Sequence, residues 1–559
     1  MSAPAAQGDE GTRGDLAWGT IPRLLAEQAT HLGSREAIAD VDAGVTLSFD
    51  QLGGAAHDAA RAFMVHGVEP GDRVGIWAPN LWEWVVAALG AQSAGAAIVP
   101  LNTRFKGREA AYILRKSGAR ALVTVGDFLG TNYLGMLRDT VGDLDGAARA
   151  ELPALETVVV VRGEGAPTAG TTGWDDFIER ADLVSSEEAD DRATRVEPGS
   201  TSDILFTSGT TGAPKGVVCT HAQTLRAFAD WSDVVGLRQG DRYLIVNPFF
   251  HGFGYKAGWL ACLMAGATNL PHAVFDAGAV LARVPRDRVS VLPGPPTLYQ
   301  SILDHPDRDR HDLSCLRLAV TGAASIPVEL ILRMRRELTF ETIITGYGLT
   351  ESCAITTMCR HDDDPETIAT TSGRAIPGTE VRVVDQSGTE APRGEPGEVV
   401  VRGYNVMQGY YDEPGATADA IDPEGWLHTG DIGIMDERGY LRITDRVKDM
   451  FIVGGFNAYP AEIENLMLRN DRIAQVAVVG IPDLRMGEVG MAFVVPRPGV
   501  EIDVDELLAW CRREMANYKA PRRAAIVPEL PLNATGKVLK YELRERAAAE
   551  PAQQAGQAG

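Results

Sequence analysis

The stretch Phe206–Gly216, FTSGTTGAPKG, decides what fold and what chemistry to expect of this chain. Glycines let the backbone adopt positive φ and approach a ligand closely, and successive backbone N–H groups form a concavity that binds anions. Hydroxyl side chains add neutral donors, and one lysine adds a mobile positive charge. The stretch therefore predicts a polyphosphate clamp. Its residues of these three kinds are Thr207, Ser208, Thr210, Thr211, Gly209, Gly212, Gly216 and Lys215.

This clamp differs from the common phosphate loop of nucleotide-binding proteins. That loop requires G-x-x-x-x-G-K followed by Ser or Thr, whereas here Lys215 is followed by Gly216. The alternative is an ordinary surface turn rich in Gly and Thr. Eleven residues of this composition around a single lysine favour the clamp.

Length and composition limit the remaining possibilities. A chain of 559 residues exceeds one hydrophobic core, so two or more domains are expected. The net charge of −23 argues against nucleic-acid binding, which requires basic surfaces. Six cysteines without a C-x-x-C pair indicate a reducing compartment and no zinc site. Neither a signal peptide nor a membrane span is expected, so the sequence predicts a cytoplasmic enzyme.

The order of apolar segments predicts an α/β fold. Short buried strands alternate with helices as far as Thr345, which is typical of parallel sheets covered by helices. Strands at Val289–Leu292, Leu316–Val320 and Thr342–Thr345 each end in a Gly-containing loop. Ligands bind at the carboxyl ends of such strands, so these loops should meet the clamp in one cleft. We expect residues 162–200, rich in Gly, Thr, Asp and Glu, to form a surface excursion.

The pattern changes after Val381. Alternating apolar and polar residues predict a small antiparallel, β-barrel-like unit of hairpins. The polar run Thr444–Asp449 then predicts a hinge near Lys448, followed by a small mobile α+β domain. The predicted boundaries are 1–447 for the large domain, 448–546 for the small domain and 547–559 for a disordered tail.

Five motifs in order carry a resemblance to a known family. The clamp resembles the phosphate-binding signature of the adenylate-forming superfamily, which includes acyl-CoA synthetases, peptide-synthetase adenylation domains and beetle luciferases. The later motifs resemble its Y-G-x-T-E, T-G-D, hinge and terminal P-x-x-x-x-G-K sequences, and Gly454–Pro460 resembles the form found in fatty-acid–CoA ligases. These later motifs are Tyr347–Glu351, Thr429–Asp431, Asp445–Lys448 and Pro531–Lys537.

The resemblance implies a site for ATP with Mg²⁺. Tyr347 would offer a flat face to adenine, Asp431 would accept hydrogen bonds from the ribose, and Glu351 would hold the metal. The implied catalytic residues are Lys537, Thr350, Glu351 and His251. The implied ATP and AMP ligands are Thr207, Ser208, Gly209, Thr210, Thr211, Gly212, Lys215, Gly322, Ala323, Ala324, Gly346, Tyr347, Gly348, Asp431 and Arg446.

The resemblance also implies an acyl pocket and a coenzyme A channel. Lys256 and Tyr255 make the acyl wall polar, so either Lys256 pairs with an acidic neighbour or the acyl group carries an oxygen. His251 either gates this pocket or is a satisfied histidine at a strand end. The implied acyl-pocket residues are His251, Phe253, Gly254, Tyr255, Lys256 and Pro295, with Gly322, Ala323 and Gly348, and the implied channel residues are Gly454, Gly455 and Phe456.

The implied reaction joins a carboxylic acid to CoA in two steps. ATP first converts the acid to acyl-AMP with release of pyrophosphate, and the CoA thiol then displaces AMP after the small domain rotates about Lys448. We expect a bulky cyclic propanoate from sterol breakdown or a medium-chain fatty acid. The alternatives are an enzyme that loads a carrier protein, a luciferase-like oxygenase and a nucleotide-sensing scaffold. A homodimer, and a lysine acetyltransferase and deacetylase acting on Lys537, are further partner hypotheses.

Overall fold

The computed structural model describes residues 18–144, 150–162, 169–208, 213–322, 326–385, 387–446, 451–458, 460–531, 538 and 540–549. The chain divides into two compact units. The larger unit comprises residues 1–103, 110–206 and 216–445, and the smaller comprises residues 104–109, 207–215 and 446–559. Each unit is described by itself below.

The first layer of the larger unit is an eight-stranded sheet in the order β20-β11-β10-β4-β3-β5-β8-β9. Neighbouring strands from β10 to β9 run parallel, as the alternation of strands and helices predicts. The strands are β3 (Arg73–Trp77), β4 (Ala97–Pro100), β5 (Ala121–Thr124), β8 (Thr157–Val160), β9 (Thr172–Gly173), β10 (Thr201–Ser208), β11 (Pro214–Thr220) and β20 (Gly409–Tyr410).

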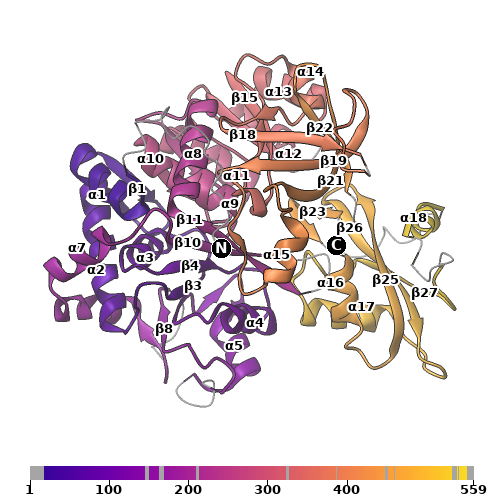
Figure 1. Ribbon diagram of the computed structural model, residues 1–559, viewed down its shortest axis with the longest axis horizontal. Coiled ribbons are helices and arrows are strands. Elements are labelled where there is room, and N and C mark those ends of the chain that lie inside the picture. Colours follow the sequence, from indigo (N-terminus) through magenta and orange to yellow (C-terminus); the bar gives the residue numbers. More distant parts are fainter. Residues whose placement is uncertain are drawn as a thin grey trace. The chain divides into compact units, whose positions relative to one another are not determined.

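Helices cover this sheet (Figure 1). α2 and α3 pack closely because Gly90 faces Ala59, where an added Cβ would lie 2.6 Å from the alanine Cβ. On β3, an added Cβ at Gly75 would lie 2.9 Å from Leu114 of α4. The helices are α1 (Ile21–Leu32), α2 (Phe49–Val65), α3 (Trp82–Ser93), α4 (Gly107–Ser117), α5 (Tyr133–Val141), α6 (Trp174–Glu179), α7 (Ser186–Thr194) and α8 (His221–Val235), and the short hairpin β6 (Asp127–Phe128) and β7 (Thr131–Asn132) precedes α5.

A second group of strands, with parallel and antiparallel pairs, lies in the same unit. The sheets β12-β13-β1-β2 and β14-β15-β16-β17 are joined through Val291, which bridges Tyr243 of β12 and Leu318 of β14. The strands are β1 (Glu36–Asp40), β2 (Val45–Ser48), β12 (Arg242–Ile245), β13 (Thr268–Pro271), β14 (Leu318–Gly322), β15 (Thr342–Tyr347), β16 (Thr357–Met358) and β17 (Arg374–Ala375). The helices are α9 (Gly252–Gly254), α10 (Ala261–Ala265), α11 (Ala277–Asp287), α12 (Pro296–Leu303), α13 (Val328–Glu337) and α14 (Pro365–Thr370).

Three local predictions need correction. Residues 162–200 are not a plain excursion, because α6 and α7 lie within them, and Phe177 is buried with its ring 4.9 Å from that of Phe63. Val289–Leu292 forms only the bridge at Val291, not a full strand. The helix expected after His251 is π-helical over Tyr255–Leu260 and kinks at Gly258, because that glycine has non-helical φ and ψ.

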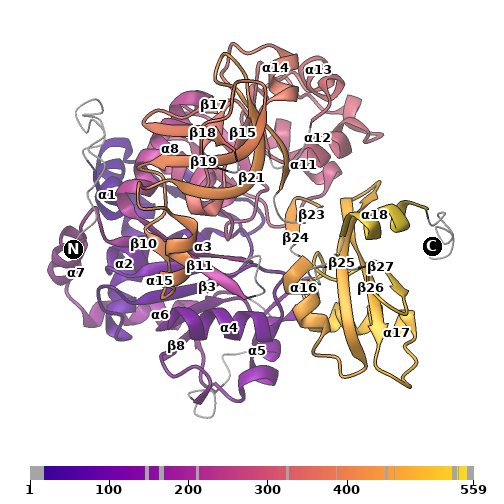
Figure 2. The same cartoon turned by 45° about the vertical axis from the view of Figure 1, so that its right-hand side comes forward.

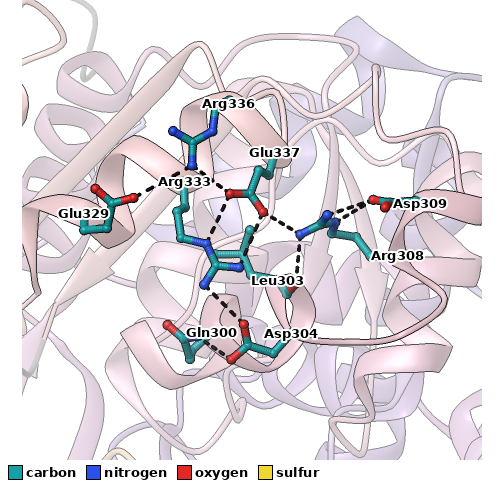
Figure 3. A network of polar contacts seen from close by, with 9 residues as sticks. All are labelled: Gln300, Leu303, Asp304, Arg308, Asp309, Glu329, Arg333, Arg336 and Glu337. Carbon is teal, nitrogen blue, oxygen red and sulfur yellow. Dashed lines mark hydrogen bonds and ion pairs between the residues drawn. The ribbon is translucent and has the colours of Figure 1, made fainter.

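Ion pairs join the C-terminal ends of α12 and α13 (Figure 3). Arg333 lies 3.2 Å from both Asp304 and Glu337 and connects the two helices. Hydrogen bonds from Arg333 and Arg336 lower the pKa of Glu337 to about 2. These side chains are partly exposed, so we assign them a local structural role.

The antiparallel unit expected after Val381 is confirmed as a sheet in the order β18-β19-β21-β22. Trp426 packs with Val384 and Val400, and the guanidinium carbons of Arg382 and Arg402 each lie 4.5 Å from its ring centroid. The four strands follow one another in an open order, and the outer strands β18 and β22 do not pair among the described residues. The elements are β18 (Thr379–Val384), β19 (Pro396–Gly403), α15 (Pro414–Ala420), β21 (Leu427–Met435) and β22 (Leu441–Arg446).

The smaller unit is α+β (Figure 2). Its sheet has the order β24-β23-β26-β25, and β27 pairs in parallel with β26. Among the described residues of both units, every helix is too short or too polar to cross a lipid bilayer. The elements are β23 (Phe451–Val453), β24 (Phe456–Ala458), α16 (Pro460–Met467), β25 (Ile473–Asp483), β26 (Gly487–Pro496), α17 (Val504–Glu514), β27 (Arg523–Ile526) and α18 (Lys540–Ala549).

Candidate active site

The predicted phosphate clamp lies between the end of β10 and the start of β11. Gly216 is required by packing at its base, because an added Cβ would lie 2.7 Å from Ile204 and 3.0 Å from Phe206. That glycine therefore lets the chain return over the side chains of the preceding strand. Of the predicted ligands, Thr207 and Lys215 fall on the two strands, whereas Gly209, Thr210, Thr211, Gly212 and the side chain of Ser208 lie outside the described residues.

Glu351 lies beside the strand that follows the clamp. Its carboxylate Oε1 accepts a hydrogen bond of 2.9 Å from the hydroxyl of Tyr410, and its backbone carbonyl accepts one of 2.8 Å from Met407 N–H. Tyr410 belongs to β20, which pairs with β11 at Val217. The chain segment around Tyr410 thus fastens Glu351 to the strand that begins at the clamp.

Tyr347 and Asp431 connect two motifs that are distant in sequence. The Tyr347 hydroxyl donates a hydrogen bond of 2.6 Å to Oδ2 of Asp431, which is buried on β21. Thr429–Asp431 lies within β21, where Asp431 N–H donates to Thr429 Oγ1 at 3.1 Å and Gly430 has a φ of +69°. The strand is irregular here, because its pairing with β19 shifts register, and it presents a carboxylate next to the aromatic side chain at the end of β15.

The parallel strands β14 and β15 end next to each other, so the loops that follow them start at one edge of the sheet. Gly322 pairs with Gly346, where an added Cβ on Gly322 would lie 2.8 Å from the Gly346 carbonyl oxygen. Gly348 is equally confined, since its Cβ would lie 2.5 Å from the Ala354 carbonyl oxygen. Pro295 caps α12 at the same edge. Ala323 and Ala324 lie outside the described residues.

His251 caps the helix that was expected to form the acyl wall. Its Nδ1 accepts a hydrogen bond of 3.2 Å from Phe253 N–H, so the proton of the neutral ring is on Nε2. His251 has an exposed residue surface, but the protein packed around its ring removes water from it, and this desolvation lowers the pKa of His251. Gly254 must be glycine, because an added Cβ would lie 2.1 Å from the Pro248 carbonyl oxygen. The chain therefore turns sharply just after the predicted gating residue.

Comparison with known protein families identifies the family of this chain. Residues 25–411 match the family described as AMP-binding enzyme, and residues 462–537 match the AMP-binding enzyme C-terminal domain. The chain belongs to the AMP-binding enzyme family. The predicted class, an ATP-dependent acid–CoA ligase that forms AMP, is confirmed by relatives along almost the whole chain.

Two curated relatives and one solved structure define the similarity. The chain is 50% identical over 526 residues to 3-[(3aS,4S,7aS)-7a-methyl-1,5-dioxo-octahydro-1H-inden-4-yl]propanoyl:CoA ligase of Rhodococcus jostii, covering 94% of this chain and 98% of that protein. It is 34% identical to the mitochondrial medium-chain acyl-CoA ligase of Homo sapiens, with coverages of 94% and 87%. A double mutant of o-succinylbenzoate CoA synthetase from Bacillus subtilis matches with a TM-score of 0.78 at 27% identity, with coverages of 93% and 98%.

In this AMP-binding enzyme the polarity of Tyr255 and Lys256, which were predicted to line the acyl pocket, is explained by buried partners within the protein. Lys256 is fully buried, and its Nζ lies 2.9 Å from Oδ1 of the equally buried Asp203. Burial opposes the charge, but Asp203 outweighs it, and the pKa of Lys256 is raised. The Tyr255 hydroxyl is also buried and accepts a hydrogen bond of 3.0 Å from Gln92. The first of the two interpretations of Lys256 is therefore correct, and its charge gives no information about the acyl group.

The smaller unit carries the predicted CoA-channel residues on a tight hairpin. Gly454 and Gly455 have φ of 55° and 84° and form the two-residue turn between Val453 and Phe456, which pair across β23 and β24. Two positive φ angles explain why both positions are glycine. Lys448 and Lys537 lie outside the described residues, as does the side chain of Arg446 at the end of β22.

The sequence analysis missed three residues of this region. Tyr410 holds Glu351, Asp203 neutralises Lys256, and Cys353 receives a hydrogen bond of 3.4 Å from Lys256. Asp203 could have been noticed, because an acidic residue inside the buried strand before the clamp needs a partner. Tyr410 and Cys353 carry no comparable sequence signal, because their roles depend on contacts between distant segments.

Proposed function

We propose that this enzyme activates a propanoic acid attached to a fused, ring-oxygenated bicycle and transfers it to CoA. The observation that supports this substrate is the 50% identity to the dioxo-octahydroindenyl-propanoyl:CoA ligase, which extends over 94% of this chain and 98% of that one. A medium-chain fatty acid is the second candidate, because the 34% identical human relative is named a medium-chain ligase. We place the reaction in the cytoplasm. We also propose that the enzyme forms a homodimer and that Lys537 is acetylated and deacetylated.

In the first step, a carboxylate oxygen of the acid attacks the α-phosphorus of ATP, and the bond to the oxygen bridging the β-phosphate breaks. Pyrophosphate leaves with the electron pair. Tyr347 stacks on adenine, Asp431 accepts the ribose hydroxyls, and the clamp around Lys215 holds the phosphates. The CoA thiol then attacks the acyl carbonyl carbon, and AMP leaves.

Glu351 suits the magnesium ion that normally accompanies ATP. Mg²⁺ prefers hard oxygen ligands and is commonly held by one or two carboxylates together with substrate phosphates. The carboxylate of Glu351 is such a ligand, and Tyr410 fixes its orientation through one oxygen. Bound magnesium would neutralise part of the phosphate charge, and Thr350 would donate its hydroxyl to the α-phosphate.

The substrate proposal is tested with a panel of acids. Purified enzyme is assayed for CoA-dependent AMP release with a bicyclic diketo-propanoate, the matching monocyclic propanoate and octanoate. We expect kcat/KM to be at least about tenfold higher for the bicyclic acid, since loss of matched apolar and polar contacts costs about 1–3 kcal/mol. Equal values for octanoate and the bicyclic acid would contradict the proposal.

The ribose assignment predicts a specific kinetic change. Asp431→Asn keeps the side-chain size but loses the charge that accepts two hydroxyl donors, so KM for ATP should rise about tenfold. KM for CoA should change little. The matched control is Asp419→Asn, which makes the same chemical change on an exposed residue of α15. If Asp431→Asn leaves the KM for ATP unchanged, Asp431 does not bind the ribose.

A further inference from the structure

The turn that carries Glu351 continues into an unfavourable backbone conformation. Thr350–Ser352 form a short 3-10 turn, and the next two residues, Cys353 and Ala354, have φ of 56° and 70°. A non-glycine residue in this left-handed region is strained, so surrounding contacts must maintain its conformation. The position of Glu351 therefore depends on what holds Cys353.

Cys353 is held by a buried lysine. The side chain of Cys353 is fully buried, and Cys353 Sγ accepts a hydrogen bond of 3.4 Å from Lys256 Nζ. The hydroxyl of Thr224 lies 3.7 Å from the same sulfur. Lys256 is fixed in turn by Asp203 at 2.9 Å. The side chain of Cys353 therefore lies in a buried polar network, where no solvent can replace the hydrogen bond from Lys256.

The same network joins three segments of the proposed active site. Asp203 lies on β10, the strand that leads into the phosphate clamp, and its Oδ2 accepts 2.7 Å from Ser202 and 3.3 Å from Thr224. Lys256 lies on the helical segment that follows His251. Cys353 directly follows the Glu351 turn. One buried ammonium from this helical segment thus contacts both the strand before the clamp and the residue two positions after Glu351.

We propose that Lys256 and Cys353 are positioning residues that fix the Glu351 carboxylate relative to β10. This inference rests on the proposed function, in which Glu351 holds magnesium and ATP. A buried ion pair is often no more stabilising than apolar side chains of the same size. The contact to Cys353 gives this ion pair a geometric role, because it ties the strained turn to the strand before the clamp.

The test measures the magnesium dependence of ATP–pyrophosphate exchange in Cys353 variants. Cys353→Ala removes the acceptor of the Lys256 hydrogen bond but leaves the Lys256–Asp203 pair intact. Its half-saturating Mg²⁺ concentration should rise about tenfold, the usual effect of losing one hydrogen bond to a charged group. Cys353→Ser restores an acceptor and should return to within about twofold of wild type. Cys262→Ala, which removes another buried thiol, is the matched control and should resemble wild type.

Cys353→Gly separates positioning from folding. Glycine adopts the observed φ of 56° without strain, so this variant should fold and yet show the raised Mg²⁺ requirement. A Mg²⁺ dependence equal to wild type in folded Cys353→Gly or Cys353→Ala would overturn the inference, as would a serine variant that is as impaired as alanine. Wild-type enzyme that shows no acid-dependent exchange would instead refute the proposed function, so the two failures are distinguishable.

Discussion

Replacing Lys537 with alanine should lower the rate of acyl-AMP formation by about 10²–10³-fold and leave the second half-reaction nearly unchanged. The reason is that negative charge moves onto pyrophosphate as the bond to the α-phosphorus breaks. An ammonium at this point stabilises the transition state more than the ground state, which lowers the barrier. Lys537 ends the stretch Pro531–Lys537, the motif that resembles the family's terminal lysine sequence.

Two assays separate the half-reactions. ATP–pyrophosphate exchange reports acyl-AMP formation, and CoA addition to chemically prepared acyl-AMP reports thioester formation. Lys540→Ala is the matched control, because it removes a lysine three residues away whose Nζ pairs with Glu464 at 2.8 Å inside the smaller unit. It should retain both activities. Equal losses of both half-reactions in Lys537→Ala would show that the lysine does not serve the first step alone.

Lys256→Met should be the most destabilising of the substitutions considered. The variant leaves Asp203 buried without its counter-charge, and breaking such a pair typically costs about 3–5 kcal/mol. Because the unfolding entropy grows with chain length, the melting temperature of a 559-residue protein should fall by about 3–4 °C. Adding Asp203→Asn in the same chain should restore most of the loss, since the second substitution removes the unpaired charge and keeps an acceptor for Ser202 and Thr224.

Thermal unfolding of the two single variants and the double variant measures this coupling. The control is Glu390→Gln, which breaks the exposed pair with Arg382 and should change stability by less than about 1 kcal/mol. A Lys256→Met protein that melts within about 0.5 °C of wild type would show that the buried pair is not needed for stability.

The sequence predicted the fold well where a local pattern sets the structure. The strands β10 and β11 on either side of the predicted clamp, and the antiparallel sheet that contains Val381, follow from glycine placement and from alternating residues. The prediction was wrong for residues 162–200, because their polar composition concealed the helix spacing that buries Trp174 and Phe177. The π-helical segment at Tyr255 was also unpredicted, since no short-range pattern distinguishes it from an α-helix.

The candidate site divides in the same way. Glu351 and Asp431 were proposed from the sequence because each lies in a recognisable motif, and in the structure Asp431 accepts a hydrogen bond from Tyr347. Tyr410 and Cys353 were not found, because each acts through a partner far away in sequence. The polarity of Lys256 suggested an oxygenated acyl group, but Asp203 accounts for that charge, and the substrate proposal now depends on similarity to relatives.

ATP–pyrophosphate exchange without CoA tests most directly whether this enzyme activates a carboxylic acid as acyl-AMP. Labelled pyrophosphate is incubated with enzyme, Mg²⁺, ATP and the bicyclic propanoate, and label entering ATP is counted. We expect label to enter ATP only when both the acid and Mg²⁺ are present, and we expect this exchange to be lost in Lys537→Ala. Absence of acid-dependent exchange with every carboxylic acid offered, in enzyme that is folded, would contradict it.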